Sequence, residues 1–244
     1  MIQVLSRALG ILEELSARES GSVKELAASS GLKKSTLCNI LKTLAQLGYV
    51  TRSGRGTYRL GPRLGQIARP QLQKEALARF GREAVLALAD ATGESAQLVV
   101  LRDGERYVLA ETRSRHDLIV NTVVLGITAA GSATGRAILA HRGEEEVRDA
   151  LQRAGGEAEP LGALKAALQE VRENGLSEYH PRGRDVVALG VPVFCGAEAV
   201  AALGVYLPSV RFRGKHRADV IESLRRAGKN LSVRLSSEAG GQAA

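Results

Sequence analysis

Residues 22–60 read SVKELAASSGLKKSTLCNILKTLAQLGYVTRSGRGTYRL, and this stretch decides the fold of the N-terminal part of the chain. Ser22 and Glu25 have the spacing of a capping box, which predicts that a helix begins after Ser22. Gly31 supplies the left-handed turn that other residues resist, and a second helix of about fifteen residues follows Leu32. This order of parts predicts a helix-turn-helix.

The second helix is amphipathic and is followed by a hairpin. Its apolar residues recur every three or four positions and therefore face inward: Leu37, Ile40, Leu41, Leu44 and Leu47. The runs 49–52 and 57–60 flank the turn Ser53-Gly54-Arg55-Gly56, which is the pattern of two short strands. Helix, turn, helix and basic hairpin predict a winged helix-turn-helix, with a double-stranded DNA operator as its first partner.

The opposite face of the second helix and the hairpin carry the candidate DNA contacts. A recognition helix reads base edges through its N-terminal residues, while arginines of a wing follow the phosphate backbone. The predicted DNA-binding residues are Lys33, Lys34, Ser35, Thr36, Asn39, Lys42 and Thr43 on the helix, and Arg52, Arg55 and Arg59 on the wing. A solvated basic face without a ligand is the alternative for any single lysine.

The distribution of charge favours DNA binding. Residues 1–70 hold 11 Lys and Arg against four Asp and Glu, whereas residues 71–244 hold 23 against 22. Nearly all of the formal net charge of +8 therefore lies in the segment that the pattern alone assigns to the helix-turn-helix.

The length of 244 residues leaves room for two domains. We expect a DNA-binding domain at 1–69 that includes an amphipathic first helix, a linker helix at 70–92 after an interruption at Pro70, a second domain at 93–236 and a disordered tail at 237–244. No apolar run reaches membrane-spanning length and no secretory segment is evident, so the sequence predicts a cytoplasmic protein. The two cysteines lack the spacing of a disulfide scaffold or a structural zinc site, and we expect neither metal nor cofactor.

The second domain mixes strands and helices. The sequence predicts strands at 97–101, 106–111, 118–124, 186–194 and 199–207, and helices at 132–141, 144–154, 161–174 and 216–235. The two apolar strands near the C-terminal end should be central. This order favours an α+β sheet covered on one face by helices, a shape that commonly holds a small ligand.

Patterns of other functional classes are missing from the sequence. The four histidines are isolated, and HExxH, G-x-S-x-G, Walker and Rossmann patterns do not occur. We therefore expect no enzyme. A ligand-independent architectural DNA binder and an RNA-binding winged helix are the alternatives; exposed aromatics for base stacking would favour RNA, and aromatic residues make up only 3% of the chain.

Blocks along nearly the whole chain resemble the isocitrate-lyase-regulator (IclR) family of bacterial transcription regulators. These blocks are LSRALGILEEL (5–15), VKELAASSGLKKSTLCNILKTLAQLGYV (23–50), TYRLGPRLGQIA (57–68), ATGESAQLVVL (91–101), GSATGRAILA (131–140), ALGVPVF (188–194) and VAALGVYLP (200–208). The resemblance implies a winged helix-turn-helix, a mixed α/β effector-binding domain with a GAF- or profilin-like sheet, dimers or tetramers on operators, and regulation of nearby catabolic genes, most often by repression.

The resemblance also implies an effector site, which this sequence matches unevenly. The candidate residues are Ser132, Ala133, Thr134, Glu178, Val186, Ala188, Gly204 and Tyr206. Glu178 is the remnant of an acidic run, Ala188 stands where the family tends to have a cysteine, and Gly204 and Tyr206 replace two serines. Ser132 at a helix start suits a carboxylate or serves only as an N-cap. Tyr206 would fill or close the pocket, while His180, Arg182 and Arg184 would favour an anionic ligand if they point inward.

Overall fold

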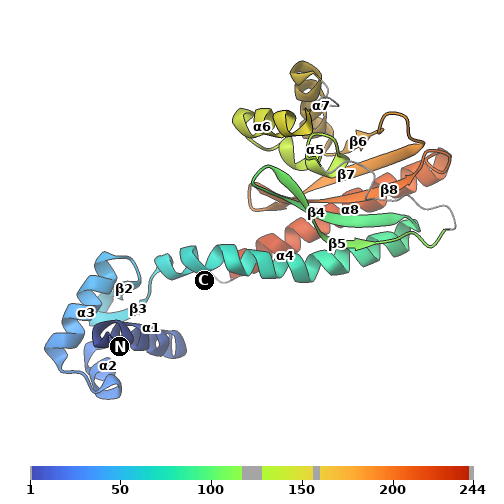
Figure 1. Cartoon of the computed structure of the whole chain (residues 1–244). Coiled ribbons are helices and arrows are strands. Elements are labelled where there is room, and N and C mark those ends of the chain that lie inside the picture. Colours follow the sequence, from blue (N-terminus) through green and yellow to red (C-terminus); the bar gives the residue numbers. More distant parts are fainter. Residues whose placement is uncertain (1, 117–127, 156–159, 242–244) are drawn as a thin grey trace. The chain divides into compact units, whose positions relative to one another are not determined.

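The computed structural model describes residues 2–116, 128–155 and 160–241. By their contacts, the described residues up to Leu72 and those from Gln73 to Gly240 form two compact units. The first unit contains α1 (Gln3–Arg18), β1 (Gly21–Ser22), α2 (Val23–Ser30), α3 (Lys34–Gln46), β2 (Val50–Ser53), the 3-10 turn η1 (Gly54–Gly56) and β3 (Thr57–Leu60). Its three strands form an antiparallel sheet in the order β1-β3-β2. The predicted winged helix-turn-helix is confirmed (Figure 1).

Local chemistry sets the helix boundaries in this unit. The Ser22 hydroxyl accepts a hydrogen bond from the Glu25 amide, and the Ser22 amide donates to the Glu25 carboxylate over 2.7 Å, which completes the capping box. Gly31 ends α2 with a φ of 67°. Leu37 and Leu41 of α3 pack against α1 and α2, whereas Leu47, predicted to face inward, lies after the end of α3 and is 58% exposed.

The helix that follows the wing differs from the prediction. Helix α4 runs without interruption from Pro62 to Thr92 and passes through Pro70, so the expected break at Pro70 is wrong. Proline removes one helical hydrogen bond and crowds the preceding turn. Here residues 65–70 are all exposed, so water can take up the carbonyl group that Pro70 leaves unpaired.

The second unit is built on a five-stranded antiparallel sheet with the order β5-β4-β8-β7-β6. The strands are β4 (Ser95–Arg102), β5 (Glu105–Thr112), β6 (Ser177–Tyr179), β7 (Val186–Cys195) and β8 (Glu198–Pro208). The apolar pair β7 and β8 is central, as the sequence predicts, while β6 was not predicted. The predicted strand at 118–124 lies outside the described residues.

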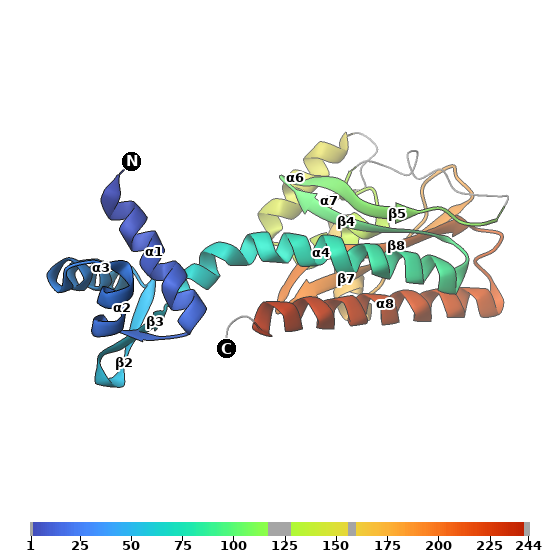
Figure 2. The ribbon, with the colours of Figure 1, turned by 90° about the horizontal axis from the view of Figure 1, so that it is seen from below.

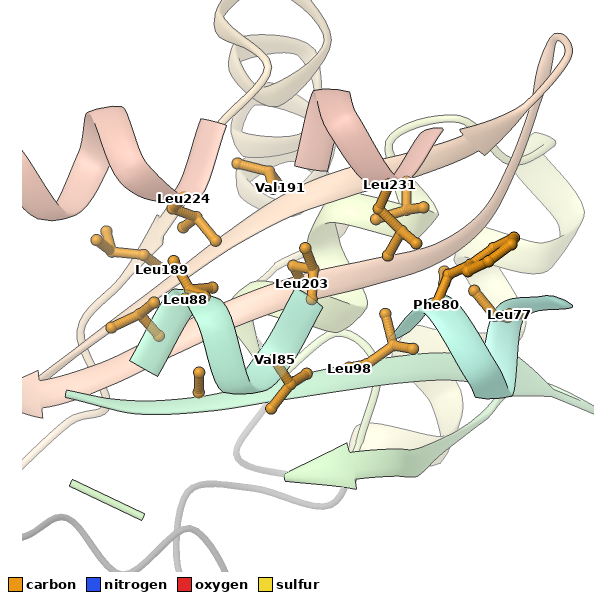
Figure 3. Packing of buried hydrophobic residues seen from close by; sticks show 14 of the residues in the cluster. Leu77, Phe80, Val85, Leu88, Leu98, Leu189, Val191, Leu203, Leu224 and Leu231 are labelled. Carbon is orange, nitrogen blue, oxygen red and sulfur yellow. The ribbon is translucent and has the colours of Figure 1, made fainter. Parts of the chain in front are cut away.

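Helices cover both faces of this sheet, so the prediction of a single covered face is wrong. Helix α8 (Gly214–Gly241) and the C-terminal part of α4 lie side by side on one face (Figures 1 and 2). Figure 3 shows Leu88 of α4 and Leu224 of α8 directed toward Leu189 and Leu203 of the sheet. Burial of these leucines contributes most of the free energy that stabilises the packing of the helices on the sheet.

The other face carries three shorter helices, α5 (Ala133–Leu139), α6 (Glu144–Ala154) and α7 (Leu161–Asn174). Ala137 and Ile138 of α5 are buried against Val99 and Ala202 of the sheet. Leu139, at the end of α5, packs with Val147 of α6 and Leu164 of α7. At the C-terminal end, α8 continues to Gly241 and so includes residues 237–241, where the sequence predicted a disordered tail; residues 242–244 lie outside the described chain.

Candidate functional site

The N-terminal half of α3 presents the predicted reading residues to solvent. Lys33 occupies the position before the helix, and Lys34, Ser35 and Asn39 are exposed on its first turns, while Thr36 is half-buried. One turn further, Lys42 and Thr43 are exposed, and the Thr43 hydroxyl donates to the Asn39 carbonyl over 3.0 Å. The structure thus brings the seven helix residues onto one short segment.

The wing arginines do not share one face. Arg52 pairs with Tyr58 across the hairpin and Arg59 pairs with Thr51, so Arg52 and Arg59 project from opposite faces of the two strands. Both are exposed, and Arg59 Nε donates to the Thr51 hydroxyl over 3.3 Å. Arg55 lies in the η1 turn between the strands. Phosphates on one side of the wing could therefore contact Arg52, and phosphates on the other side could contact Arg59.

Most of the predicted effector residues gather on the α5 face of the sheet. Ala133, Ala188 and Tyr206 are buried together, and Val186 packs against them. Thr134 lies over Gly204, where a Cβ atom would approach the Thr134 methyl group to 2.5 Å. A glycine at 204 is thus required by the close approach of α5.

The Ser132 hydroxyl is engaged in the structure of the helix. It accepts a hydrogen bond of 3.1 Å from the Gly135 amide, and Ser132 is 3% exposed. Of the two roles that the sequence left open, this geometry supports the N-cap, which satisfies one of the free amides at the start of a helix.

A polar cluster beside these residues escaped the sequence analysis. Arg106 of β5 donates to the Thr134 hydroxyl through Nε and to the Tyr206 hydroxyl through Nη2, each over 3.1 Å. Gln97 of β4 donates to the same Tyr206 hydroxyl, and its own side-chain oxygen is buried without a hydrogen-bond partner among the described residues. Burial raises the pKa of Tyr206, so the phenol is neutral at physiological pH.

Alternation along the strands is the signal that could have found this cluster. Gln97 pairs with Gly204 in neighbouring strands and so shares its face of the sheet. The missing information was which strands are neighbours, because Gln97 and Tyr206 are 109 residues apart in the sequence.

Glu178 does not join the other predicted effector residues. It pairs with Leu189, which faces the α4 and α8 side of the sheet, whereas the adjacent Tyr179 pairs with Ala188 on the α5 side. The Glu178 carboxylate instead contacts Arg217 of α8 at 3.3 Å and His180 at 2.9 Å. Its placement with Ser132 and Tyr206 is therefore corrected: an unpredicted strand, β6, sets its direction.

The basic loop after β6 does not point inward either. His180, Arg182 and Arg184 are all exposed, and His180 is engaged by Glu178. The anionic ligand that they would favour by pointing into the pocket finds no support from these side chains.

Neither a metal centre nor a transmembrane helix is found in the part of the chain that the structure describes. No three His, Cys, Asp or Glu side chains there are grouped so that they could hold a metal ion. Among the same residues, no helix combines the length and the apolar character needed to cross a bilayer. Cys38 is exposed and Cys195 buried, each as a free thiol.

Comparison with known families accounts for both units. Residues 4–54 match the IclR helix-turn-helix domain, and residues 71–233 match the bacterial transcriptional regulator IclR C-terminal domain. The chain belongs to the IclR family. It is accordingly a DNA-binding transcription regulator with a separate effector-binding domain.

Similar proteins extend over most of the chain. The acetate operon repressor of Salmonella typhimurium is 30% identical over 77% of this chain and 73% of its own length. The probable regulator ArcR of Halobacterium salinarum is 27% identical over 93% of this chain and 92% of its own. A crystal structure of an IclR regulator from Silicibacter sp. TM1040 superposes with a TM-score of 0.59 at 26% identity, and covers 96% of both chains.

A further IclR homologue, from Microbacterium hydrocarbonoxydans, has been solved in complex with 4-hydroxybenzoate. It is 23% identical to this chain, with a TM-score of 0.56, and covers 96% of this chain and 99% of its own. At that identity the likeness shows a shared fold.

Proposed function

We propose that this IclR-family regulator represses nearby metabolic genes and that a small carboxylate controls its affinity for the operator. Repression is supported by the relatives, since the Salmonella protein is an acetate operon repressor and an Escherichia coli relative, 29% identical over 75% of this chain and 72% of its own length, is the transcriptional repressor IclR. A carboxylate is supported by the 4-hydroxybenzoate bound to the Microbacterium homologue.

The α3 helix would read the operator. Ser35, Thr36 and Asn39 would contact base edges in the major groove, while Lys33 and Lys34 would meet phosphates or guanine edges. Lys42 and Thr43 lie one turn further along, and the arginines of the wing would hold the flanking backbone. Two copies of the chain, in a dimer or a dimer of dimers, would place two such helices on an imperfect palindrome.

The effector would bind on the α5 face of the sheet, among Thr134, Val186, Ala188, Gly204 and Tyr206. The observation that carries this proposal is the half-buried Arg106 beside Thr134 and Tyr206. Its two hydrogen bonds use two of the five N–H donors of a guanidinium, and an arginine in a partly desolvated site is well suited to a carboxylate. With the Ser132 hydroxyl committed to the helix cap, Arg106 is the better anchor.

Control by the effector would follow from a difference in its affinity for two conformations of the dimer. The conformation that binds the effector more tightly gains population, and operator affinity shifts by the ratio of those two affinities. Helix α4, which continues from the wing into the effector-binding domain, is the element through which we expect the change to pass.

The experiment is a selection of operator sequences from random duplex DNA with the purified chain, followed by titrations with and without small carboxylates. We expect a palindromic consensus. We also expect one carboxylate to change the affinity of the protein for that consensus by about ten-fold or more, which is typical of allosteric coupling. An Arg106→Gln chain should bind the consensus normally and lose the response. If no carboxylate changes the affinity, the ligand-independent alternative replaces this proposal.

A further inference from the structure

A cavity lies at the β6 edge of the sheet, between α7 and α8, with a volume of about 410 Å³. Volumes of this size are typical of sites for small organic ligands. Its walls come from α5, α7, β6 and α8, so it lies wholly within the effector-binding domain. Of the effector residues that the sequence predicts, Glu178 lines this cavity; the residues proposed above to bind the effector on the α5 face, and those proposed to bind DNA, do not.

Two helices supply stripes of side chains to this cavity. Arg217, Ile221 and Arg225 follow one another at four-residue spacing on α8, so an apolar side chain lies between two guanidinium groups. Helix α7 faces them with Ala167 and Val171. The cavity therefore has an apolar middle with cationic ends.

Three arginines line the cavity, and they differ in their surroundings. Arg136 of α5 is 7% exposed, and its Nε donates to the Ala130 carbonyl over 2.7 Å. Arg225 donates to the Asn174 carbonyl at the end of α7 over 3.0 Å, and Arg217 contacts Glu178 at 3.3 Å. Arg217 and Arg225 are exposed and Arg136 is buried, so guanidinium groups of both α5 and α8 line the space in which a carboxylate would accept charge-assisted hydrogen bonds.

The acidic side chains define the charge of the ligand. The Glu178 carboxylate already contacts Arg217 and His180, so its electrostatic repulsion of an anionic ligand is reduced. Glu170 of α7 also lines the cavity, and its carboxylate disfavours a second negative charge. We propose that this cavity, centred on Arg136 and Arg225, binds a small organic monoanion that has one carboxylate and an apolar body.

This site shares a wall with the proposed effector pocket without overlapping it. The Arg136 guanidinium lies 4.4 Å from the centre of the Tyr179 ring, and Tyr179 packs against the cluster of Ala133, Ala188 and Tyr206. A ligand that moves Arg136 would therefore also shift the Tyr179 ring and the residues packed against it on the α5 face. The binding itself does not depend on the proposed function.

The test uses the full chain with 4-bromobenzoate, whose bromine can be located by anomalous scattering in crystals. We expect a bromine peak between α7 and α8, beside Ile221. Benzoate titration of an Arg106→Gln chain, in which the α5 face is disabled, should still detect one site. Adding Arg225→Gln should weaken that site at least about ten-fold, as expected for the loss of a charge-assisted contact.

Two further variants guard against misreading. Lys229→Gln removes an exposed cation one turn along α8 and should leave the affinity unchanged. Ala167→Leu fills the cavity without changing charge and should abolish binding while the protein remains folded, as monitored by its melting temperature. Bromine density confined to the α5 face, or equal affinities of the Arg225→Gln and Lys229→Gln chains for benzoate, would overturn the inference. Loss of binding with Arg106→Gln alone would contradict it and leave the effector proposal intact.

Discussion

The Arg106 guanidinium on β5 donates a hydrogen bond of 3.1 Å to the hydroxyl of Tyr206 on β8, across the strand β4 that lies between them. Gln97 on β4 donates to the same hydroxyl. A single phenol thus ties three neighbouring strands together on the α5 face. Tyr206 is 2% exposed, so water cannot easily replace it as a hydrogen-bond partner.

Replacing Tyr206 with phenylalanine should destabilise the effector-binding domain by about 1–3 kcal/mol, because the donors of Gln97 and Arg106 lose a buried acceptor. Urea unfolding followed by circular dichroism measures the change. Tyr107→Phe is the matched control, since Tyr107 is 43% exposed and its hydroxyl reaches only Glu105 at 3.4 Å. Equal midpoints for the two variants would mean that the hydroxyl of Tyr206 contributes nothing to stability.

Glu94 forms a second buried polar contact, on which acid stability should depend. Its fully buried carboxylate accepts from Arg211 Nε over 2.8 Å and lies 3.0 Å from His216 Nε2. Burial acts to raise the pKa of Glu94, but the hydrogen bonds from Arg211 and His216 outweigh it and hold the pKa below the usual 4.5. Stability from this group is therefore complete above pH 4.5 and is lost as the pH falls through the lower pKa of the folded state.

We expect Glu94→Gln to cost about 2–3 kcal/mol at pH 7, somewhat less than the loss of a fully buried pair because Arg211 and His216 stay partly solvated. The difference from wild type should shrink as the pH falls below 4. Denaturant titrations between pH 3 and pH 7 measure both quantities. Glu144→Gln is the control, since hydrogen bonds from Lys165 and Arg148 also lower the pKa of Glu144, but the group is exposed and screened by solvent. A pH-independent effect of Glu94→Gln would refute the assignment.

Gly190 of β7 is a position where the contact of α5 with the sheet leaves no room for a side chain. A Cβ atom there would lie 2.6 Å from the Ala133 carbonyl oxygen, a backbone atom that cannot move aside without shifting α5. Gly190→Ala should destabilise the domain by more than about 2 kcal/mol, through strain of the kind that overpacked cores show.

The control is Gly162→Ala on α7, where a Cβ atom meets nothing within 4 Å. Alanine is the better helix former, so that variant should be neutral or more stable by up to about 1 kcal/mol. Thermal unfolding of the two proteins in parallel gives the comparison. Similar melting temperatures would show that α5 does not press on β7 as closely as the structure indicates.

Sequence alone predicts well where short-range chemistry decides. The capping box of Ser22 and Glu25 and the turn at Gly31 involve groups a few residues apart, and their predicted structures are confirmed. Long-range placement is less accessible. The direction of Glu178 depends on whether β6 forms and on its pairing with β7, since a strand sends neighbouring side chains to opposite faces. Pro70 is a case in which short-range chemistry misleads. Proline predicts the end of a helix, yet α4 continues through it, because water can hydrogen-bond to the exposed carbonyl group that Pro70 leaves unpaired.

The two kinds of predicted DNA contact should respond differently to mutation. Arg52 lies on the wing, so Arg52→Gln should weaken binding about equally for all sequences and lower the slope of log affinity against log salt by about one. Asn39 is exposed on the second turn of α3. Asn39→Ala should instead change the preferred base at one position of each half-site and reduce the binding free energy at that base pair by about 1–3 kcal/mol. Binding of a base-pair substitution series at several salt concentrations separates the two effects.

Gln46→Ala, at the far end of α3 and also exposed, is the control for helix integrity. If Asn39→Ala keeps the wild-type order of preference across the series, the reading face has been assigned to the wrong side of α3.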